Sequence, residues 1–285
     1  MKSKKFALLS LLMLGSISLS SCYLDLGFIQ IGEKEDSTDQ GGGGSGGDSG
    51  NYDSDSQAEI NAYYASIGSQ SGESLLSALR SVIHTSSVVV GYDWSRYEKA
   101  DEDPSNSTNV LLIYARTSYK KTAHVRNNVG WNREHTFPQS KLQDEQATND
   151  THIIYASDCA VNSTRSNYKL GVVTNGSVVY DSYGNTTQCR LGNSKFDPNN
   201  EARGIVARST MYAAAMYGYD PTDNFESLAT MLKWHLDYPV TKFDTSRNSK
   251  VYKLQKNRNP FVDHPEYACK IWGSKNSATK AACGM

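Results

Sequence analysis

A glycine-rich stretch near the N-terminus limits where this chain of 285 residues can fold. The run Gly41-Gly42-Gly43-Gly44-Ser45-Gly46-Gly47 stands among Asp, Ser and Glu residues, within a polar segment that extends from Tyr23 to Gln57. Such a composition cannot bury enough apolar surface to offset the entropy that a chain loses when it becomes ordered. We therefore expect residues 23–57 to be a flexible acidic tether and residues 58–285 to form the folded domain.

Residues 1–22 have the composition of a bacterial export signal. Three lysines among the first five residues precede an apolar stretch ending at Leu14, which is too short to span a bilayer as a helix. The segment closes with Leu19-Ser20-Ser21-Cys22, which resembles the lipobox, where cleavage before a cysteine exposes its thiol to lipidation. We expect an exported protein with lipid on Cys22 that anchors it to a membrane of the cell envelope. Plain secretion, with cleavage near the same place, is the alternative.

Four cysteines follow the export signal, at positions Cys159, Cys189, Cys269 and Cys283. An even number of cysteines in an exported protein permits two disulfides, with three possible pairings. None of them has the Cys-x-x-Cys spacing of a zinc cluster. Cys269 and Cys283 are close enough in sequence to close a small C-terminal loop, and buried thiols are the alternative for all four.

The charge of the chain is unevenly distributed. The formal net charge is −1, but residues 23–57 contain eight acidic residues against one lysine, so the rest of the chain is net positive. Around the motif described below, five basic residues face only one acid, Glu134; they are Lys120, Lys121, Arg126, Arg133 and Lys141. A locally basic site suits a polyanionic partner, although charge alone would equally fit a solvated surface.

Hydrophobic periodicity predicts a mixture of helices and strands. A helix should bury Leu75, Leu76, Leu79, Val82 and Ile83 on one face, and further helices are predicted at Glu201–Met216, Phe225–Leu236 and 244–257. Strands are predicted at Val88–Val90, Val110–Tyr114 and His152–Ala156, a helix start at Ser163–Tyr168, and a β-hairpin at Val172–Asp181 that turns at Asn175-Gly176. Since strands and helices do not alternate strictly, the pattern favours an α+β fold.

The residues between Gly130 and Tyr168 combine the groups needed for metal-assisted hydrolysis. Glu134 offers a hard carboxylate oxygen for a divalent cation, and the imidazole of His135 can deprotonate water near neutral pH. Because neighbouring strand residues point to opposite faces, these two can serve one site only at a strand end or a turn. Asn162 offers a neutral oxygen ligand, and Arg165, one helical turn later, has a guanidinium that matches phosphate. These groups are compatible with phosphodiester hydrolysis.

Three blocks in this region resemble the bacterial endonuclease I family, which belongs to the ββα-metal or His-Me finger nucleases. The blocks are Asn-Arg-Glu-His-Thr-Phe-Pro-Gln-Ser at 132–140, Asp-Thr-His at 150–152 and Val-Asn-Ser-Thr-Arg-Ser-Asn-Tyr at 161–168. Two later blocks, at 232–240 and 257–265, resemble the C-terminal part of the same family. The likeness extends over residues 70–272 in the family's order, and it implies an α+β fold built around a ββα-metal finger.

The resemblance also implies a reaction and a set of roles. His135 would be the general base that activates water, and Glu134 and Asn162 would hold one divalent cation, Mg²⁺ first, with Mn²⁺ or Ca²⁺ as alternatives. The first strand of the finger would deliver Glu134 and His135, the second would lie near His152–Ala156, and the helix would open near Asn162. The substrate would be DNA, and RNA as well, cleaved with little sequence specificity. The products would carry 5′-phosphate ends. We expect the protein to be a monomer.

Neighbouring residues receive supporting roles. Arg133 and Arg165 are the candidates for binding phosphate, with a structural salt bridge as the alternative for Arg165, and Asp150 and His152 should support the site. Trp131 and Phe137 could stack on bases or pack in the core. Of the other histidines, His124 should lie at the surface, while His235 and His264 should be structural.

Two other functions remain compatible with the sequence. The chain could be a surface lipoprotein that binds nucleic acid without catalysis, in which case binding would need neither His135 nor a metal. It could also be a phosphodiesterase for small substrates. A zinc protease is disfavoured, because the sequence contains no His-Glu-x-x-His motif.

Overall fold

The computed structural model describes Gly50 and residues 52–285; the predicted signal peptide, Cys22 and most of the predicted tether lie outside the described residues. The last residues of the predicted tether pack against the domain. The main-chain amide of Asp53 donates to Ser246 Oγ over 2.9 Å, and Asp55 forms a salt bridge with Arg258. Asp53 and Asp55 thus contact the folded domain although they precede Ala58.

Helices supply most of the regular structure. The α-helices are α1 (Gln57–Tyr63), α2 (Gly72–Ser86), α3 (Trp94–Ala100), α4 (Cys159–Arg165), α5 (Asn200–Tyr217), α6 (Leu228–Asp237), α7 (Lys242–Gln255), α8 (Pro260–Asp263), α9 (Tyr267–Trp272) and α10 (Ser277–Ala282). Short 3₁₀ turns are η1 (Gln139–Lys141), η2 (Ala147–Asn149) and η3 (Pro221–Asp223). Among residues 50 and 52–285, no helix combines the length and apolar character needed to cross a bilayer.

The strands form three small sheets within the described part of the chain. The first contains β1 (Glu102–Asp103), β2 (Asn106–Leu111) and β3 (Ser118–Lys120), and the second pairs β4 (Trp131–His135) with β5 (Ile154–Asp158). The third has the order β6-β9-β8-β7, from β6 (Lys169–Leu170), β7 (Ser177–Tyr180), β8 (Thr186–Gly192) and β9 (Lys195–Asp197). Every pair except β6–β9 is antiparallel. This mixture confirms the predicted α+β class.

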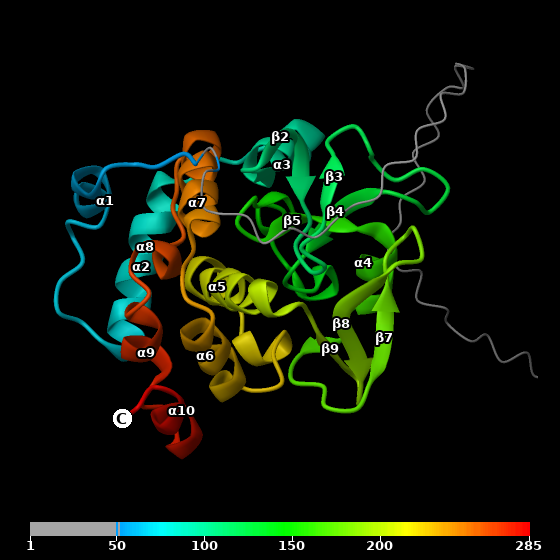
Figure 1. The fold of residues 1–285 in the computed structure, drawn as a ribbon. Coiled ribbons are helices and arrows are strands. Elements are labelled where there is room, and N and C mark those ends of the chain that lie inside the picture. The colour runs from blue at the N-terminus through cyan, green and yellow to red at the C-terminus, as the bar shows by residue number, and fades with distance from the viewer. Residues whose placement is uncertain (1–49, 51) are drawn as a thin grey trace, which may run out of the picture. The chain divides into compact units, whose positions relative to one another are not determined.

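The helix α5 lies at the centre of the main hydrophobic core. Every residue from Gly204 to Met216 is buried, so the helix is surrounded by protein rather than amphipathic at a surface. Asn199 caps its start, and Gly218 ends it with a φ of 78°, a left-handed conformation that glycine adopts without strain. In Figure 1 the helices α2 and α5–α9 gather on one side of the described domain, and the labelled strands gather with α3 and α4 on the other.

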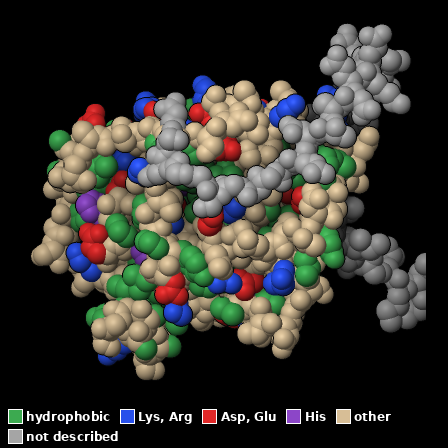
Figure 2. Space-filling view, in the orientation of Figure 1, with side chains coloured by type: hydrophobic (Ala, Val, Ile, Leu, Met, Phe, Trp, Pro, Cys, Tyr) green, Lys and Arg blue, Asp and Glu red, His purple; other side chains and the backbone are tan. Residues whose placement is uncertain are grey.

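A second, smaller core lies beneath the strands. It consists of Tyr97, Val110, Leu112, Trp131, Ile154 and Ala156. These residues come from α3, from β2 and its end, and from the β4–β5 pair, so this core fixes the segment that carries Glu134 and His135. On the face drawn in Figure 2, Lys and Arg side chains lie among Asp and Glu side chains, in keeping with the near-neutral net charge.

The strongest periodic patterns predicted their elements correctly, whereas two local signals did not. The helices predicted from Leu75, from Glu201, from Phe225 and at 244–257 correspond to α2, α5, α6 and α7. The strand predicted at Val88–Val90 is wrong, because this segment has no strand partner and lies in a loop. The hairpin predicted to turn at Asn175-Gly176 is also wrong, because β7 begins at Ser177 and turns instead through residues 181–185 into β8.

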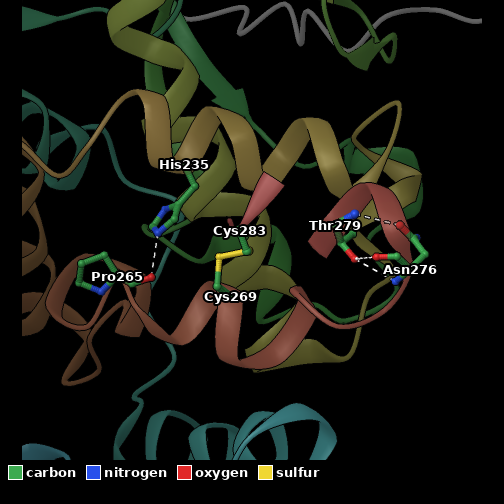
Figure 3. The surroundings of a disulfide bond; sticks show 6 residues. All are labelled: His235, Pro265, Cys269, Asn276, Thr279 and Cys283. Carbon is green, nitrogen blue, oxygen red and sulfur yellow. Dashed lines mark hydrogen bonds between the residues drawn. A yellow bond between two sulfur atoms is a disulfide. The ribbon is translucent and has the colours of Figure 1, made fainter. Parts of the chain in front are cut away.

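A disulfide joins Cys269 of α9 to Cys283, just after α10, and closes the small C-terminal loop that their spacing permitted. Figure 3 shows this bond beside the contact of His235 with the main-chain oxygen of Pro265, to which Nε2 lies 2.9 Å away. Asn276 caps α10 through a capping box with Thr279. The C-terminal segment is therefore held both covalently and by a helix cap. Cys159 and Cys189 are buried.

Candidate active site

Glu134 and His135 are the last two residues of β4, and the strand paired with β4 leads directly into a helix. In the antiparallel pair, Glu134 lies opposite Tyr155 and His135 opposite Ile154. β5 ends at Asp158, and α4 begins at the next residue. The order is thus two antiparallel strands followed by a helix.

The start of β4 depends on a glycine. Gly130 has a φ of 102°, and a Cβ at this position would lie 2.4 Å from the carbonyl oxygen of Ala123. That oxygen accepts the main-chain hydrogen bond of Trp131, the first residue of β4, over 2.9 Å. Any larger residue at 130 would displace the strand that carries the candidate site.

The helix α4 starts earlier than the sequence indicated. The carboxylate of Asp158 accepts hydrogen bonds from the amides of Ala160 and Val161, so it is the N-cap. Asn162 therefore lies inside the helix rather than at its start. This position leaves the Asn162 side chain available for contacts with β4.

His135 is oriented by a main-chain carbonyl. Its Nε2 lies 3.0 Å from the oxygen of Thr148, so a neutral ring donates there and keeps its lone pair on Nδ1. The side chain is only 7% exposed. Burial lowers the pKa of the imidazole, opposed by the Thr148 carbonyl and assisted by Arg165 and Arg133. A neutral imidazole with a defined tautomer is the form that can accept a proton from water.

The carboxylate of Glu134 is buried and held through one of its two oxygens. Oε1 accepts a hydrogen bond from the Tyr114 hydroxyl and lies 3.3 Å from Nη1 of Arg165. Neither contact uses Oε2. Burial raises the pKa of Glu134 to about 7, against the opposing effects of Arg165, Tyr114 and the His135 amide. A nearby cation would favour the ionised form of this carboxylate.

Asn162 faces the same side of β4 as Glu134. Its Nδ2 donates to Oδ1 of Asn132 over 2.8 Å. Asn132 and Glu134 are two residues apart in the strand, so their side chains lie on the same face. Because the amide nitrogen is used in this contact, the carboxamide oxygen is the atom left to bind a ligand. Glu134 and Asn162 thus offer two hard oxygens from adjacent elements, the donor type that Mg²⁺ and Ca²⁺ prefer.

The wider surroundings contain few other metal-binding groups. Among the residues that the structure describes, no three His, Cys, Asp or Glu side chains converge into a group that could hold a metal ion. A cation at Glu134 and Asn162 would therefore rely on water and substrate oxygens for most of its ligands. Mg²⁺ commonly binds in this way.

Arg165 is a buried structural residue. It is 1% exposed, and its Nη2 donates to the main-chain oxygen of Thr136 and to Oδ1 of Asn224, over 2.9 and 2.8 Å. Its Nη1 donates to the main-chain oxygens of His135 and Ser166. Of the two roles considered for Arg165, these contacts favour the structural salt bridge over a phosphate contact.

Arg133 occupies a different environment, on the same face of β4 as His135. Its guanidinium lies over two aromatic rings, 3.6 Å from the centroid of Tyr92 and 4.1 Å from that of Trp94. Its Nη1 donates to the main-chain oxygen of Tyr92 over 3.0 Å. No sequence signal marks Tyr92 or Trp94, because neither belongs to the blocks that resemble the family and only folding brings them to Arg133.

Asp150 and His152 lie in a buried polar network behind the strands. The Asp150 carboxylate accepts hydrogen bonds from the hydroxyls of Tyr212 and Tyr217 and from Nε2 of Gln255, at 2.6–2.7 Å. The Nε2 of His152 lies 3.1 Å from the main-chain oxygen of Asn257, and burial lowers the pKa of this histidine to about 4. Both residues are therefore placed to hold the segment before β5.

The other aromatic and histidine residues considered from the sequence contact their surroundings through packing, stacking or hydrogen bonds. Trp131 and Phe137 have no exposed surface, which assigns both to the core rather than to base stacking. His124 is partly exposed, and its ring stacks on Trp94 while its Nε2 lies 2.8 Å from Glu98. His235 is buried, and His264 stacks on Tyr267, as the structural assignment requires.

Comparison with known proteins identifies the family. The family model of endonuclease I matches residues 71–266. An extracellular ribonuclease of Bacillus amyloliquefaciens is 34% identical over 240 residues, which cover 75% of this chain and 79% of that protein. An extracellular deoxyribonuclease of Aeromonas hydrophila is 28% identical over 123 residues, or 41% of this chain and 51% of that protein. The chain belongs to the endonuclease I family.

Proposed function

We propose that this protein is an exported endonuclease that hydrolyses the phosphodiester bonds of DNA and RNA with one divalent cation, Mg²⁺ before Mn²⁺ or Ca²⁺. The observation that carries the proposal is the hydrogen bond of His135 Nε2 to the Thr148 carbonyl, which leaves Nδ1 to act as a base. Family membership supplies the reaction class.

In this proposal the β4–β5 pair and α4 form the ββα-metal finger. Glu134 and His135 point to opposite faces at the end of β4, so a phosphate can meet both only across the edge of β4 that does not pair with β5. His135 Nδ1 takes the proton of a water molecule, which attacks phosphorus in line with the leaving 3′ oxygen. The products carry 5′-phosphate and 3′-hydroxyl ends.

Glu134 and Asn162 would hold the cation through Oε2 and Oδ1. When bound, the cation supplies charge stabilisation for the transition state and for the leaving oxygen. Tyr114 and Arg165 fix the Glu134 carboxylate through Oε1 and so orient Oε2. Asp150 and His152 hold the segment that contains Thr148. Arg133, rather than Arg165, contacts a phosphate of the substrate, because it is only partly buried and, like His135, lies against Tyr92.

Broad substrate use follows from this arrangement. Contacts to phosphate and metal carry no sequence information, so little base specificity is expected. One relative is named as a ribonuclease and another as a deoxyribonuclease, which supports activity on both polymers. Both are named extracellular, which supports export, and the Leu19-Ser20-Ser21-Cys22 sequence adds a lipid anchor on Cys22. We propose a monomer.

The test is cleavage of plasmid DNA and of a structured RNA by the chain beginning at Tyr23, with Mg²⁺ and with EDTA. His135→Ala should lower the rate by about 10²–10⁴ while DNA binding persists, and the exposed His84→Ala serves as the matched control. Binding of DNA without cleavage under any divalent metal would support the binding lipoprotein instead. Fast cleavage of bis-p-nitrophenyl phosphate with poor cleavage of polymers would support the small-substrate phosphodiesterase.

A further inference from the structure

A row of planar groups leads away from the candidate base. The ring of His135 is stacked with that of Tyr92, with centroids 6.1 Å apart and an interplanar angle of 19°. The guanidinium of Arg133 lies over the rings of both Tyr92 and Trp94. Trp94 in turn stacks on His124, with centroids 4.1 Å apart. The row therefore joins His135 to the loop and helix that precede β1.

The first part of this row is at the surface. Tyr92 is 43% exposed, and it belongs to a loop, residues 87–93, that also exposes Val88 and Val89. The space beside Gly91 in this loop is also open, since a Cβ placed there would meet no other atom within 4 Å. Tyr92 is therefore a partly exposed ring in contact with an arginine, and such a ring offers a surface on which a base can stack.

The charge beside Tyr92 favours an anionic ligand. No carboxylate of residues 50 and 52–285 forms an ion pair with Arg133, and its one hydrogen bond goes to the main chain of Tyr92. Contacts with two aromatic rings restrict the guanidinium, while its remaining in-plane donors are not used. A nucleotide offers both groups that such a site can bind, a phosphate for the guanidinium and a base for the ring.

We propose that Tyr92 and Arg133 form a nucleotide subsite next to the scissile phosphate, in which an unpaired base stacks on Tyr92 while Arg133 binds its phosphate. This inference rests on the proposed function, since it assumes that His135 marks the scissile bond. In a duplex the bases stack on one another and present only their edges, so only a single-stranded or locally unpaired segment can use the ring. The subsite therefore gives the enzyme a preference for single-stranded nucleic acid.

The first experiment compares kcat/KM for a single-stranded oligonucleotide and for the same sequence held in a duplex, using the full chain. Tyr92→Leu should lower kcat/KM on the single strand by about tenfold, the size of one lost base stack, and change the duplex rate less than twofold. Tyr92→Phe keeps the ring and should stay near wild type. The matched control is Tyr183→Leu, which alters another exposed tyrosine, 58% exposed, on the turn after β7.

Equal losses on both substrates in Tyr92→Leu would mean that the ring only holds Arg133 in place, and would overturn the subsite. Unchanged rates on both would overturn it as well. Arg133→Ala, by contrast, should lower kcat/KM for both substrates, because a phosphate contact does not depend on base pairing. Failure of the wild type to cleave either substrate would instead count against the proposed function, so the two failures are distinguishable.

A second experiment locates the stacked base. A single-stranded oligonucleotide with one phosphodiester among phosphorothioate linkages is prepared with an abasic site at each neighbouring position in turn. One position should lower kcat/KM in wild type and Tyr92→Phe but have no effect in Tyr92→Leu. Equal sensitivity of wild type and Tyr92→Leu at every position would overturn the proposal.

Discussion

The guanidinium of Arg165 and the carboxylate of Glu134 lie 3.3 Å apart, and both side chains are almost completely buried. Replacing Arg165 with Met removes the only cation that contacts this carboxylate in the described residues. Because a buried charge without its partner is costly, the free energy of unfolding should fall by about 3–5 kcal/mol. Glu134 should also bind protons more readily, so more Mg²⁺ should be needed for half-maximal cleavage. Urea unfolding and a metal titration measure the two effects, with the exposed Arg126→Met as control.

The proposed metal ligands can be tested by titration. Asn162→Ala and Glu134→Ala should each raise the Mg²⁺ concentration for half-maximal cleavage by about tenfold or more, since each removes one of two protein oxygens. Asn167→Ala, an exposed asparagine just after α4, should leave the titration unchanged. A titration of Asn162→Ala that overlays the wild type would remove Asn162 from the ligand set.

Stability should fall as the solution is acidified, partly because of His235. Burial lowers the pKa of this residue in the folded protein to about 4, whereas the ordinary value is 6.5. Between these values the unfolded chain binds a proton that the folded protein does not, so stability is lost as pH falls from about 6.5 towards 4, by about 1.4 kcal/mol per pH unit. His235→Gln should lower that slope by about this amount, while the exposed His84→Gln should leave it unchanged. Identical slopes in His235→Gln and wild type would contradict the assignment.

The C-terminal disulfide should contribute to stability through the loop that it closes. Cys269 and Cys283 are 14 residues apart, a separation for which chain entropy predicts about 3 kcal/mol. Cys283→Ser should lose about this much in denaturant unfolding and should no longer respond to reductant. A wild type whose unfolding curve is the same with and without reductant would show that the bond does not contribute.

The lipid anchor can be tested by metabolic labelling. Wild type expressed in a bacterial host should incorporate labelled palmitate and sediment with membranes, because acyl chains on Cys22 would bury their methylenes in the bilayer. Cys22→Ala should lose the label. Equal labelling of the two proteins would leave plain secretion as the remaining explanation.

The sequence predicted long periodic helices better than local turns. The spacing of apolar residues predicted which face of α2 is buried and how long α5 is, and tertiary packing stabilises both helices. Asn175-Gly176 is a strong local hairpin signal, yet the turn formed where Asp181 accepts hydrogen bonds from the amides of Tyr183 and Asn185. Val88–Val90 has strand propensity but found no partner strand. Local preference was overridden wherever pairing depended on distant segments.

The sequence pointed to candidate site residues only where they fall in the blocks that resemble the family. Glu134 and His135 occur in one block, and the strand that carries them was expected. The groups that orient them come from elsewhere: Tyr114 binds Glu134, Thr148 binds His135, and Tyr92 covers Arg133. No periodicity or motif links Tyr92 to Arg133 across 41 residues. Such contacts depend on the packing of α3 and the neighbouring loop against β4.

The Asp150 network has a consequence for how this enzyme would lose activity. Asp150 follows η2, the turn whose Thr148 carbonyl orients His135, and it is bonded to Tyr212 and Tyr217 of α5 and to Gln255 of α7. The orientation of the His135 imidazole therefore depends on the helices at the centre of the main core. Heat or denaturant that unfolds those helices would therefore abolish activity in the same transition. Residual activity would then measure the fraction of molecules that remain folded.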